Sequence, residues 1–484
     1  MTVPLRLLAD QAFSRAAGAP LIPGNRITLL RDARENYPAW LEAIAAARHW
    51  IHFETYIIQS DGAGRVFAEA LAARARAGVR VRVLVDWMGS LGKTSWSFWR
   101  QLKEAGIDAR TFNPPTLASP FAWLSRDHRK MLSVDGHTAF VTGMCVGDQW
   151  VGDRDKGIEP WRDTGVGIAG PAVADVEVAF AEAWALAGDA LPPDERVARE
   201  ALPSAGDMAV RVIASMPAMG GMFRLDQLVA GLARKSLWVT DAYFVGVNAY
   251  VAALCNAARD GVDVRLLVPG SGTDIAMIQR LTRTGYRALL DGGVRVFEWN
   301  GPMIHAKTAV ADDRWARVGS TNLNVQSWLG NLELDVAVED DRFGREMAAM
   351  YEQDLENATE IVLRRRRVRP ADPSAVRDRA RRGSRGRNRT ARAAAGALRI
   401  GHTFSAVLNG RRTVARAEAA TLIYGAAIAL ALAFVSLRWP RVIALPIGVL
   451  VAWLGTAWAV RAWKLYRQRP EDVDAADRPV AEKA

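Results

Sequence analysis

The chain has 484 residues, which is more than one hydrophobic core usually requires, so we expect two packed halves with appendages. Its two cysteines, Cys145 and Cys255, are too few and too far apart for a disulfide framework or a zinc site, and they suit a reducing cytoplasmic setting. The first twenty residues lack the basic and apolar regions of a secretory signal, so we expect no export.

The formal net charge of +11 is concentrated in one segment. Residues 364–392 contain thirteen arginines and two aspartates, which leaves the rest of the chain close to neutral. A basic run confined to one segment beside apolar stretches favours anionic lipid over nucleic acid as a partner. A solvated linker is the other interpretation of this segment, and the two are compatible.

Along the chain, two stretches share one pattern. AGVRVRVLV at 77–85 and DGVDVRLLV at 260–268 agree at six of nine positions, and each follows an Ala-rich helical stretch. Upstream, WIHFETYII at 50–58 corresponds to LWVTDAYFV at 237–245. These β-branched runs predict buried strands, so we expect an α/β fold of two similar halves, residues 1–200 and 201–363, with the active site between them.

One motif occurs once in each half. His128-Arg-Lys130 and His305-Ala-Lys307 both fit the pattern HxKxxxxD, which ends at Asp135 and Asp312. Residues two apart on a strand point to the same face, so each pair directs an imidazole and an ammonium into one cavity. Two lysines can bind the oxygens of a phosphodiester while one imidazole attacks phosphorus and the other protonates the leaving oxygen.

The two motifs resemble the paired signatures of the phospholipase D superfamily. Residues 24–360 are most similar to bacterial cardiolipin synthases of the short type that lacks N-terminal membrane spans. The segments that carry this resemblance include GNRITLLRDARENYPAW, DAYFVG and VGSTNLNVQSWLGNLEL. The resemblance implies a covalent phosphohistidine, no metal or other cofactor, His128 as nucleophile and His305 as general acid. Nothing in the sequence itself decides which histidine attacks.

Several further side chains are candidates for supporting roles. We place Asp135 and Asp312 in the catalytic set, although turn formation alone explains an aspartate where a strand turns back. By resemblance, Asp163 and Glu333 are the acids that orient the imidazoles. Gly319-Ser-Thr-Asn322 resembles the segment that lines the phosphate site, whereas the first half has a cysteine, Cys145, where the family commonly has asparagine.

The C-terminal part predicts a membrane anchor. After an Arg-rich linker at 364–418, two charge-free stretches at 419–437 and 442–460 each span roughly 28 Å as helices, close to the hydrocarbon thickness of a bilayer. Basic residues flank this hairpin at 419–460 on both outer sides, so we expect the tail 461–484 and the catalytic region to face the cytoplasm at a bacterial inner membrane.

The resemblance implies that one phosphatidylglycerol gives its phosphatidyl group to the histidine and a second accepts it, which makes cardiolipin. A hydrolytic phospholipase D would use the same residues with water as the acceptor. A nuclease is disfavoured because the catalytic region lacks net positive charge. A non-enzymatic lipid-binding scaffold would leave both His–Lys pairs without a use. The sequence decides neither the acceptor alcohol, nor the donor headgroup, nor the oligomeric state, nor the role of the Arg-rich segment.

Overall fold

The computed structural model describes residues 5–116, 122–153, 155–364 and 367–370, together with isolated positions between 438 and 459. The chain divides into two compact units, one of residues 1–113 with 125–387 and the other of residues 114–124 with 388–484. The described strands and both His–Lys motifs belong to the first unit.

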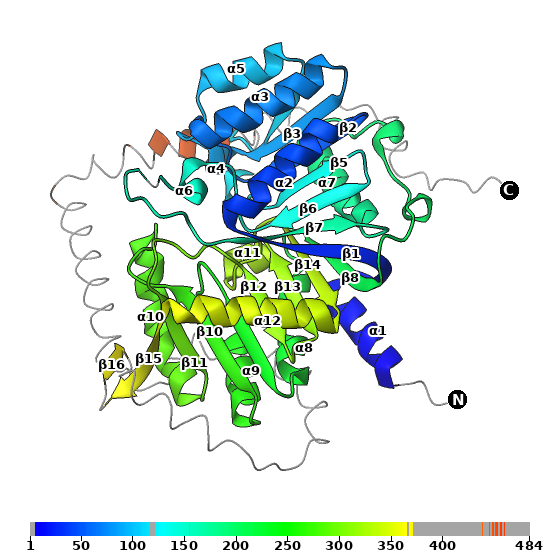
Figure 1. The fold of residues 1–484 in the computed structure, drawn as a ribbon. Helices are drawn as coiled ribbons and strands as arrows, with labels where there is room; N and C mark the ends of the chain where they lie inside the picture. The colour runs from blue at the N-terminus through cyan, green and yellow to red at the C-terminus, as the bar shows by residue number, and fades with distance from the viewer. Residues whose placement is uncertain are drawn as a thin grey trace. The chain divides into compact units, whose positions relative to one another are not determined.

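Sixteen described strands form one sheet whose order shows the duplication: β16-β15-β11-β10-β9-β12-β13-β14-β8-β1-β7-β6-β5-β2-β3-β4. From β1 outward the order is 1-7-6-5-2-3-4, and from β8 outward it is 8-14-13-12-9-10-11, so the halves match strand for strand. β1 and β8 pair antiparallel at the centre. The predicted α/β fold of two repeated halves is confirmed (Figure 1).

The first half, blue to cyan in Figure 1, carries helices on both faces of its strands. Its strands are β1 (Ile22–Arg31), β2 (Trp50–Thr55), β3 (Arg80–Asp86), β4 (Asp108–Phe112), β5 (Lys130–Val134), β6 (Thr138–Thr142) and β7 (Thr164–Ala169). Its helices are α1 (Leu5–Ala17), α2 (Asp32–Ala46), α3 (Gly62–Arg76), α4 (Trp87–Ser90), α5 (Trp96–Glu104), α6 (Asp148–Val151) and α7 (Val173–Leu186). Short 3₁₀ turns at Ala122–Leu124, Pro193–Glu195 and Arg199–Ala201 complete this part of the chain.

The second half, green to yellow, repeats the arrangement and adds two edge strands. Its strands are β8 (Met208–Ser215), β9 (Ser236–Thr240), β10 (Asp263–Pro269), β11 (Arg295–Trp299), β12 (Thr308–Ala311), β13 (Trp315–Gly319), β14 (Glu333–Glu339), β15 (Ala358–Arg364) and β16 (Arg367–Pro370). Its helices are α8 (Gly221–Leu232), α9 (Asn248–Arg259), α10 (Ala276–Asp291), α11 (Val325–Leu329) and α12 (Asp341–Glu356).

A shared core joins the halves. One cluster of buried side chains contains Val166 and Ile168 of β7 together with Val336 and Val338 of β14, and both α7 and α12 pack on it. Burial on this scale is the main favourable contribution to folding, so the two halves form one folding unit rather than two tethered domains.

Both motifs lie at one edge of the sheet. Lys130 pairs with Thr55 where β5 begins and β2 ends, and Thr308 pairs with Thr240 where β12 begins and β9 ends. We call this the motif edge. Loops that follow parallel strands carry function in many α/β proteins because a rigid sheet positions them.

No helix in the described part of the chain is both long and apolar enough to cross a membrane. The two stretches of the expected hairpin, 419–437 and 442–460, lie outside the described residues except for isolated positions.

Candidate active site

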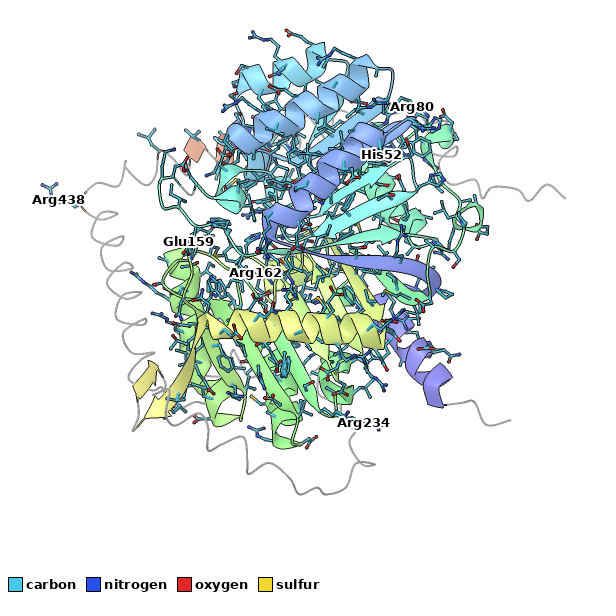
Figure 2. The ribbon with its side chains drawn as sticks, in the orientation of Figure 1. His52, Arg80, Glu159, Arg162, Arg234 and Arg438 are labelled. Atoms are coloured by element: carbon cyan, nitrogen blue, oxygen red, sulfur yellow. The ribbon has the colours of Figure 1, made fainter. Side chains whose placement is uncertain are left out.

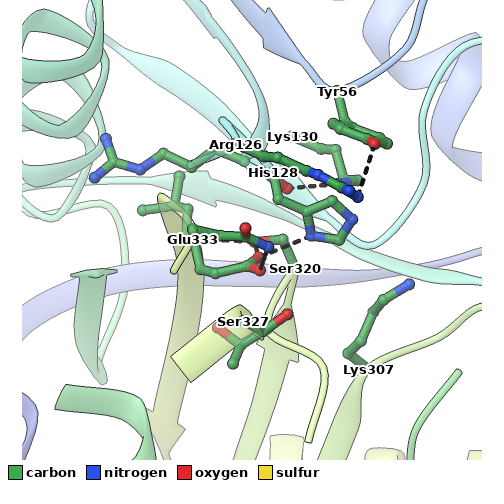
Figure 3. A network of polar contacts seen from close by, with 12 residues as sticks. Tyr56, Arg126, His128, Lys130, Lys307, Ser320, Ser327 and Glu333 are labelled. Carbon is green, nitrogen blue, oxygen red and sulfur yellow. Dashed lines mark hydrogen bonds and ion pairs between the residues drawn. The ribbon is translucent and has the colours of Figure 1, made fainter. Parts of the chain in front are cut away.

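The structure places both His–Lys pairs in buried positions at the motif edge. His128 is 8% exposed and His305 is 5% exposed, while Lys130 and Lys307 are each 1% exposed. The Nζ atom of each lysine donates to the backbone carbonyl of the histidine two residues before it. Figure 3 shows Lys307 of the second half extending toward the imidazole of His128 in the first, so the two motifs contribute to one site.

Each histidine is held by an acid from the opposite half. Nδ1 of His128 lies 2.9 Å from Glu333 Oε2 at the start of β14, and Nδ1 of His305 lies 2.8 Å from Asp163 Oδ2, just before β7. The sequence suggested these two acids, but it did not show that each one serves the histidine of the other half.

The backbone makes the same crossing. The amide of His128 donates to the carbonyl of Leu332 at 2.9 Å, and the amide of His305 donates to the carbonyl of Arg162 at 2.7 Å. Each carbonyl belongs to the residue just before the acid. A short parallel bridge accompanies each bond, so the segment that carries an acid is fixed against the segment that carries the opposite histidine.

Arg162 anchors one of these segments between the halves (Figure 2). Its guanidinium donates to both carboxylate oxygens of Asp354 on α12, at 2.8 and 2.9 Å, and to Asp32 Oδ1 at 3.2 Å. Burial opposes the charge of this guanidinium, but Asp354 and Asp32 outweigh burial and raise its pKa. A bidentate buried pair fixes position more rigidly than a single hydrogen bond. The pair of Arg162 with Asp354 therefore also fixes the position of the next residue, Asp163.

The two acids are themselves satisfied by hydrogen bonds. Ser320 Oγ donates to Glu333 Oε2 at 2.6 Å, and the Asn331 amide donates to Oε1 at 3.1 Å. Trp150 Nε1 donates to Asp163 Oδ2 at 3.1 Å. Burial alone would raise the pKa of both carboxyls, but the neighbouring histidines and lysines hold the pKa of each below its usual range. Both acids therefore stay ionised.

The imidazoles are poised in the neutral form. Burial lowers the pKa of His128 to about 4, with Lys130 adding to the effect and Glu333 opposing it. Burial and Lys307 likewise lower the pKa of His305 to about 4. A neutral imidazole whose Nδ1–H is given to a carboxylate keeps the lone pair on Nε2, which is the atom a nucleophile or a base uses. Burial also lowers the pKa of Lys307 to about 8.

Two tyrosines beside the histidines were not singled out from the sequence. The ring of Tyr56 meets His128 edge-on at 4.9 Å, and the ring of Tyr243 meets His305 edge-on at 5.8 Å. The lysines lie over the same rings, at 5.2 and 5.8 Å. Burial raises the pKa of both phenols, to about 12 for Tyr56, so both keep their proton. Tyr243 donates its proton to Asp274, whereas Tyr56 can donate to a phosphate oxygen. The sequence feature that could have identified them is that both occupy the same position in the two corresponding strand segments, 50–58 and 237–245.

Asp135 and Asp312 lie at the opposite end of β5 and β12 from the histidines. The Asp135 carboxylate accepts the backbone amides of residues 48, 49 and 50 at 2.7 to 2.9 Å, and the Asp312 carboxylate accepts those of residues 234, 235 and 236 at 2.6 to 3.1 Å. Both have φ of 53°, in the left-handed region that aspartate tolerates in tight turns. Each carboxylate holds the start of β2 or β9, which is the structural role in the turn that the sequence left open beside a catalytic one.

Asp135→Ala should therefore lower the stability of the fold rather than the rate of the catalysed reaction. The variant loses three charge-assisted hydrogen bonds and puts alanine at positive φ, so we expect a loss of roughly 2–4 kcal/mol in the free energy of unfolding. Asp135→Asn, which tolerates the same φ and keeps one acceptor oxygen, should lose less. Thermal unfolding in detergent measures both. Lost turnover in a variant of unchanged stability would instead give Asp135 a catalytic role.

The phosphate-lining segments differ between the halves. Asn322 and Cys145 are both buried, at 3% and 2% exposure. A Cβ atom at Gly143 would lie 2.4 Å from Asp163 Oδ1, and one at Gly319 would lie 2.4 Å from Asp335 Oδ1, so both glycines allow a carboxylate to approach closely.

Within the described residues, no group of three or more His, Cys, Asp or Glu side chains has a metal-binding arrangement.

Comparisons with known proteins agree with this geometry. A family profile described as cardiolipin synthase, PLD-like domain, matches residues 40–151 and 230–357, one segment in each half. The cardiolipin synthase of Alkalihalophilus pseudofirmus is 31% identical over 348 residues, covering 71% of this chain and 68% of that protein. Cardiolipin synthase A of Pseudomonas putida is 32% identical over 364 residues, covering 73% of each.

The chain belongs to the cardiolipin synthase family of the phospholipase D superfamily. The assignment to this superfamily, and to phosphatidyltransferases within it, is confirmed. Among solved structures, phosphatidylserine synthase of Haemophilus influenzae matches with a TM-score of 0.57 at 16% identity, over 73% of this chain and 91% of that one. That likeness supports the fold.

Proposed function

We propose that this cardiolipin synthase relative transfers the phosphatidyl group of one phosphatidylglycerol to a second phosphatidylglycerol. The observation that carries the proposal is the pair of buried histidines, each with a lysine of its own half and a carboxylate of the opposite half. The similarity to enzymes named cardiolipin synthase supports the choice of lipid.

The first step forms a bond between His128 Nε2 and phosphorus and breaks the bond from phosphorus to the glycerol oxygen. His305, as imidazolium, gives its proton to that oxygen, and glycerol leaves. Lys130 and Lys307 hold the non-bridging oxygens and stabilise the charge that develops there. Burial and these lysines lower the pKa of both imidazoles, and an anionic phosphodiester bound between them would raise the pKa of His305 toward the protonated form that this step needs.

In the second step, a hydroxyl of the second phosphatidylglycerol gives its proton to neutral His305 and attacks phosphorus. The bond between phosphorus and His128 breaks, which releases cardiolipin and restores both histidines to their starting state. The net reaction converts two phosphatidylglycerol molecules to cardiolipin and glycerol. In this mechanism Asp163 and Glu333 orient the imidazoles, Asn322 helps to line the phosphate site, and Asp135 and Asp312 hold the strands.

Mass spectrometry of the products tests the reaction. Detergent-purified protein incubated with phosphatidylglycerol should form cardiolipin and glycerol in equal amounts, and a His128→Ala control should form neither. Phosphatidic acid without cardiolipin would identify water as the acceptor and make the enzyme a hydrolase.

We also propose that the chain is organised as halves at 1–200 and 201–363, a linker at 364–418, a membrane hairpin at 419–460 and a cytoplasmic tail at 461–484. The charge-free length of the two stretches and the basic residues that flank them support it. A reporter enzyme fused after Ala484 should respond as cytoplasmic in bacterial cells. A periplasmic response would contradict this topology.

A further inference from the structure

Large apolar side chains are exposed at the motif edge in both halves. Six of them, which we call the apolar rim, are Leu91, Trp96, Val151, Ile275, Met277 and Val325, with exposed fractions of 57, 90, 51, 42, 69 and 54%. They come from equivalent places: the connections after β3 and β10, and the short helices after β6 and β13. In Figure 1, α4 and α6 of the first half and α10 of the second lie toward the left of the view.

In the first half, hydrogen bonds fix the rim beside the active-site tyrosine. The segment after Tyr56 bonds to the loop that carries Leu91, through Ser60 N to Lys93 O at 3.2 Å and through Thr94 Oγ1 to Ile58 O. It also bonds to the strand end that leads into α6, since Val146 N donates to Ile57 O at 3.2 Å. The residue that contacts His128 and the rim therefore share one supporting loop.

The second half repeats this arrangement around its own tyrosine. The Tyr243 hydroxyl donates to Asp274 at 2.8 Å, next to Ile275, and the Asn324 amide donates to the carbonyl of Tyr243 at 3.0 Å, next to Val325. Tyr243 faces His305 as Tyr56 faces His128, so in both halves the tyrosine beside the catalytic histidine is hydrogen-bonded to a segment next to the rim or lies on one.

We propose that the apolar rim is the surface by which the catalytic region enters the lipid bilayer. This inference rests on the proposed function, because a two-chain lipid must then reach histidines that are no more than 8% exposed. Apolar side chains inserted among the acyl chains let the headgroup rise into the site while the chains stay out of water.

The charges beside the rim favour an anionic bilayer over a protein partner. Exposed Lys93 lies between Leu91 and Trp96 in sequence, and exposed Arg280 follows Met277 by three residues. The neighbouring carboxylates of Asp148 and Asp274 accept hydrogen bonds from the start of α3 and from Tyr243. Basic side chains among exposed apolar ones are typical of surfaces that bind anionic membranes. A planar membrane also contacts four separate segments at once while the site between them stays accessible to lipid.

Fluorescent labelling of the full chain tests the location. Trp96→Cys and Met277→Cys, each labelled with an environment-sensitive dye, would be reconstituted in vesicles of phosphatidylglycerol and phosphatidylethanolamine with brominated acyl chains. The native Cys145 and Cys255 are only 2% and 4% exposed, so the introduced thiol takes the label. Both rim labels should shift to the blue and be quenched, whereas a label at Leu232→Cys, 48% exposed at the opposite edge, should not. Rim labels that behave like the Leu232 control would overturn the proposal.

Turnover provides a second measurement. Leu91→Glu combined with Val325→Glu should lower turnover of vesicle phosphatidylglycerol by about 10-fold or more, since two apolar insertions are lost. Short-chain phosphatidylglycerol below its micelle concentration should be turned over at the native rate, and Leu232→Glu should leave both rates unchanged. Equal loss on both substrates would overturn the role in bilayer entry. The labels report insertion without turnover. Quenched rim labels on a chain that makes no cardiolipin would therefore support insertion by the apolar rim and contradict the proposed reaction.

Discussion

His128→Ala should reduce cardiolipin formation by at least about 10⁴-fold, because it removes the atom that forms the covalent intermediate. His305→Ala should cost about 10²–10⁴-fold, the usual contribution of a general acid and base. A nitrophenyl ester of phosphatidic acid separates the nucleophile from the general acid, because its nitrophenolate leaving group is a stable anion that departs without a proton. His305→Ala should react with this ester and then stall, because no base activates the acceptor.

The stalled enzyme should carry one phosphatidyl group on residue 128, which intact-protein mass spectrometry and peptide mapping can locate. The matched control is His52→Asn, which changes a buried histidine outside the site, one that contacts Glu177 at 2.6 Å. An adduct on residue 305 in the His128→Ala variant would reverse the assignment of the two histidines.

Local pattern was enough to predict much of this molecule. The duplicated strand segments predicted two α/β halves. The spacing of His128 and Lys130 predicted side chains on one face of a strand, whereas β5 begins only at Lys130 and His128 lies two residues before it. The turn at Asp135 was also visible in the sequence, because Asp-Gly is a strong turn signal. What local pattern did not show is that its carboxylate reaches back across 85 residues to the start of β2.

The partners of the histidines could not be read from the sequence because they depend on how the halves meet. Glu333 is 205 residues from His128 and Asp163 is 142 residues from His305, and both contacts follow from the pairing of β1 with β8. Tyr56 and Tyr243 were missed for another reason. An aromatic residue just after a buried strand is usually part of the core.

Glu333→Gln and Asp163→Asn should each reduce turnover by about 10²–10⁴-fold, although neither carboxylate touches the substrate. An amide can give its own proton to Nδ1, which moves the imidazole proton to Nε2 and removes the reactive lone pair. Each carboxylate also raises the pKa of its histidine against burial. Loss of Glu333 should therefore lower the pKa of His128 and move the acidic limb of the pH profile of the first step to lower pH, because His128 attacks in its neutral form. Loss of Asp163 should lower the pKa of His305 and move the basic limb of that profile to lower pH, because His305 acts in its protonated form. Glu360→Gln, which changes an ion pair with Arg295 on the far strands, is the control for folding.

The crossing of the halves makes these two variants distinguishable. Asp163 serves His305, so Asp163→Asn impairs proton transfer, and the nitrophenyl ester should restore the first step. Glu333 serves His128, so Glu333→Gln impairs the nucleophile, and the same ester should restore little. Stopped-flow detection of nitrophenolate measures the first step directly. If acids served the histidine of their own half, the ester would restore Glu333→Gln and leave Asp163→Asn slow. The site depends on contacts between the halves, so a duplicated sequence becomes one catalytic centre only when both halves fold together.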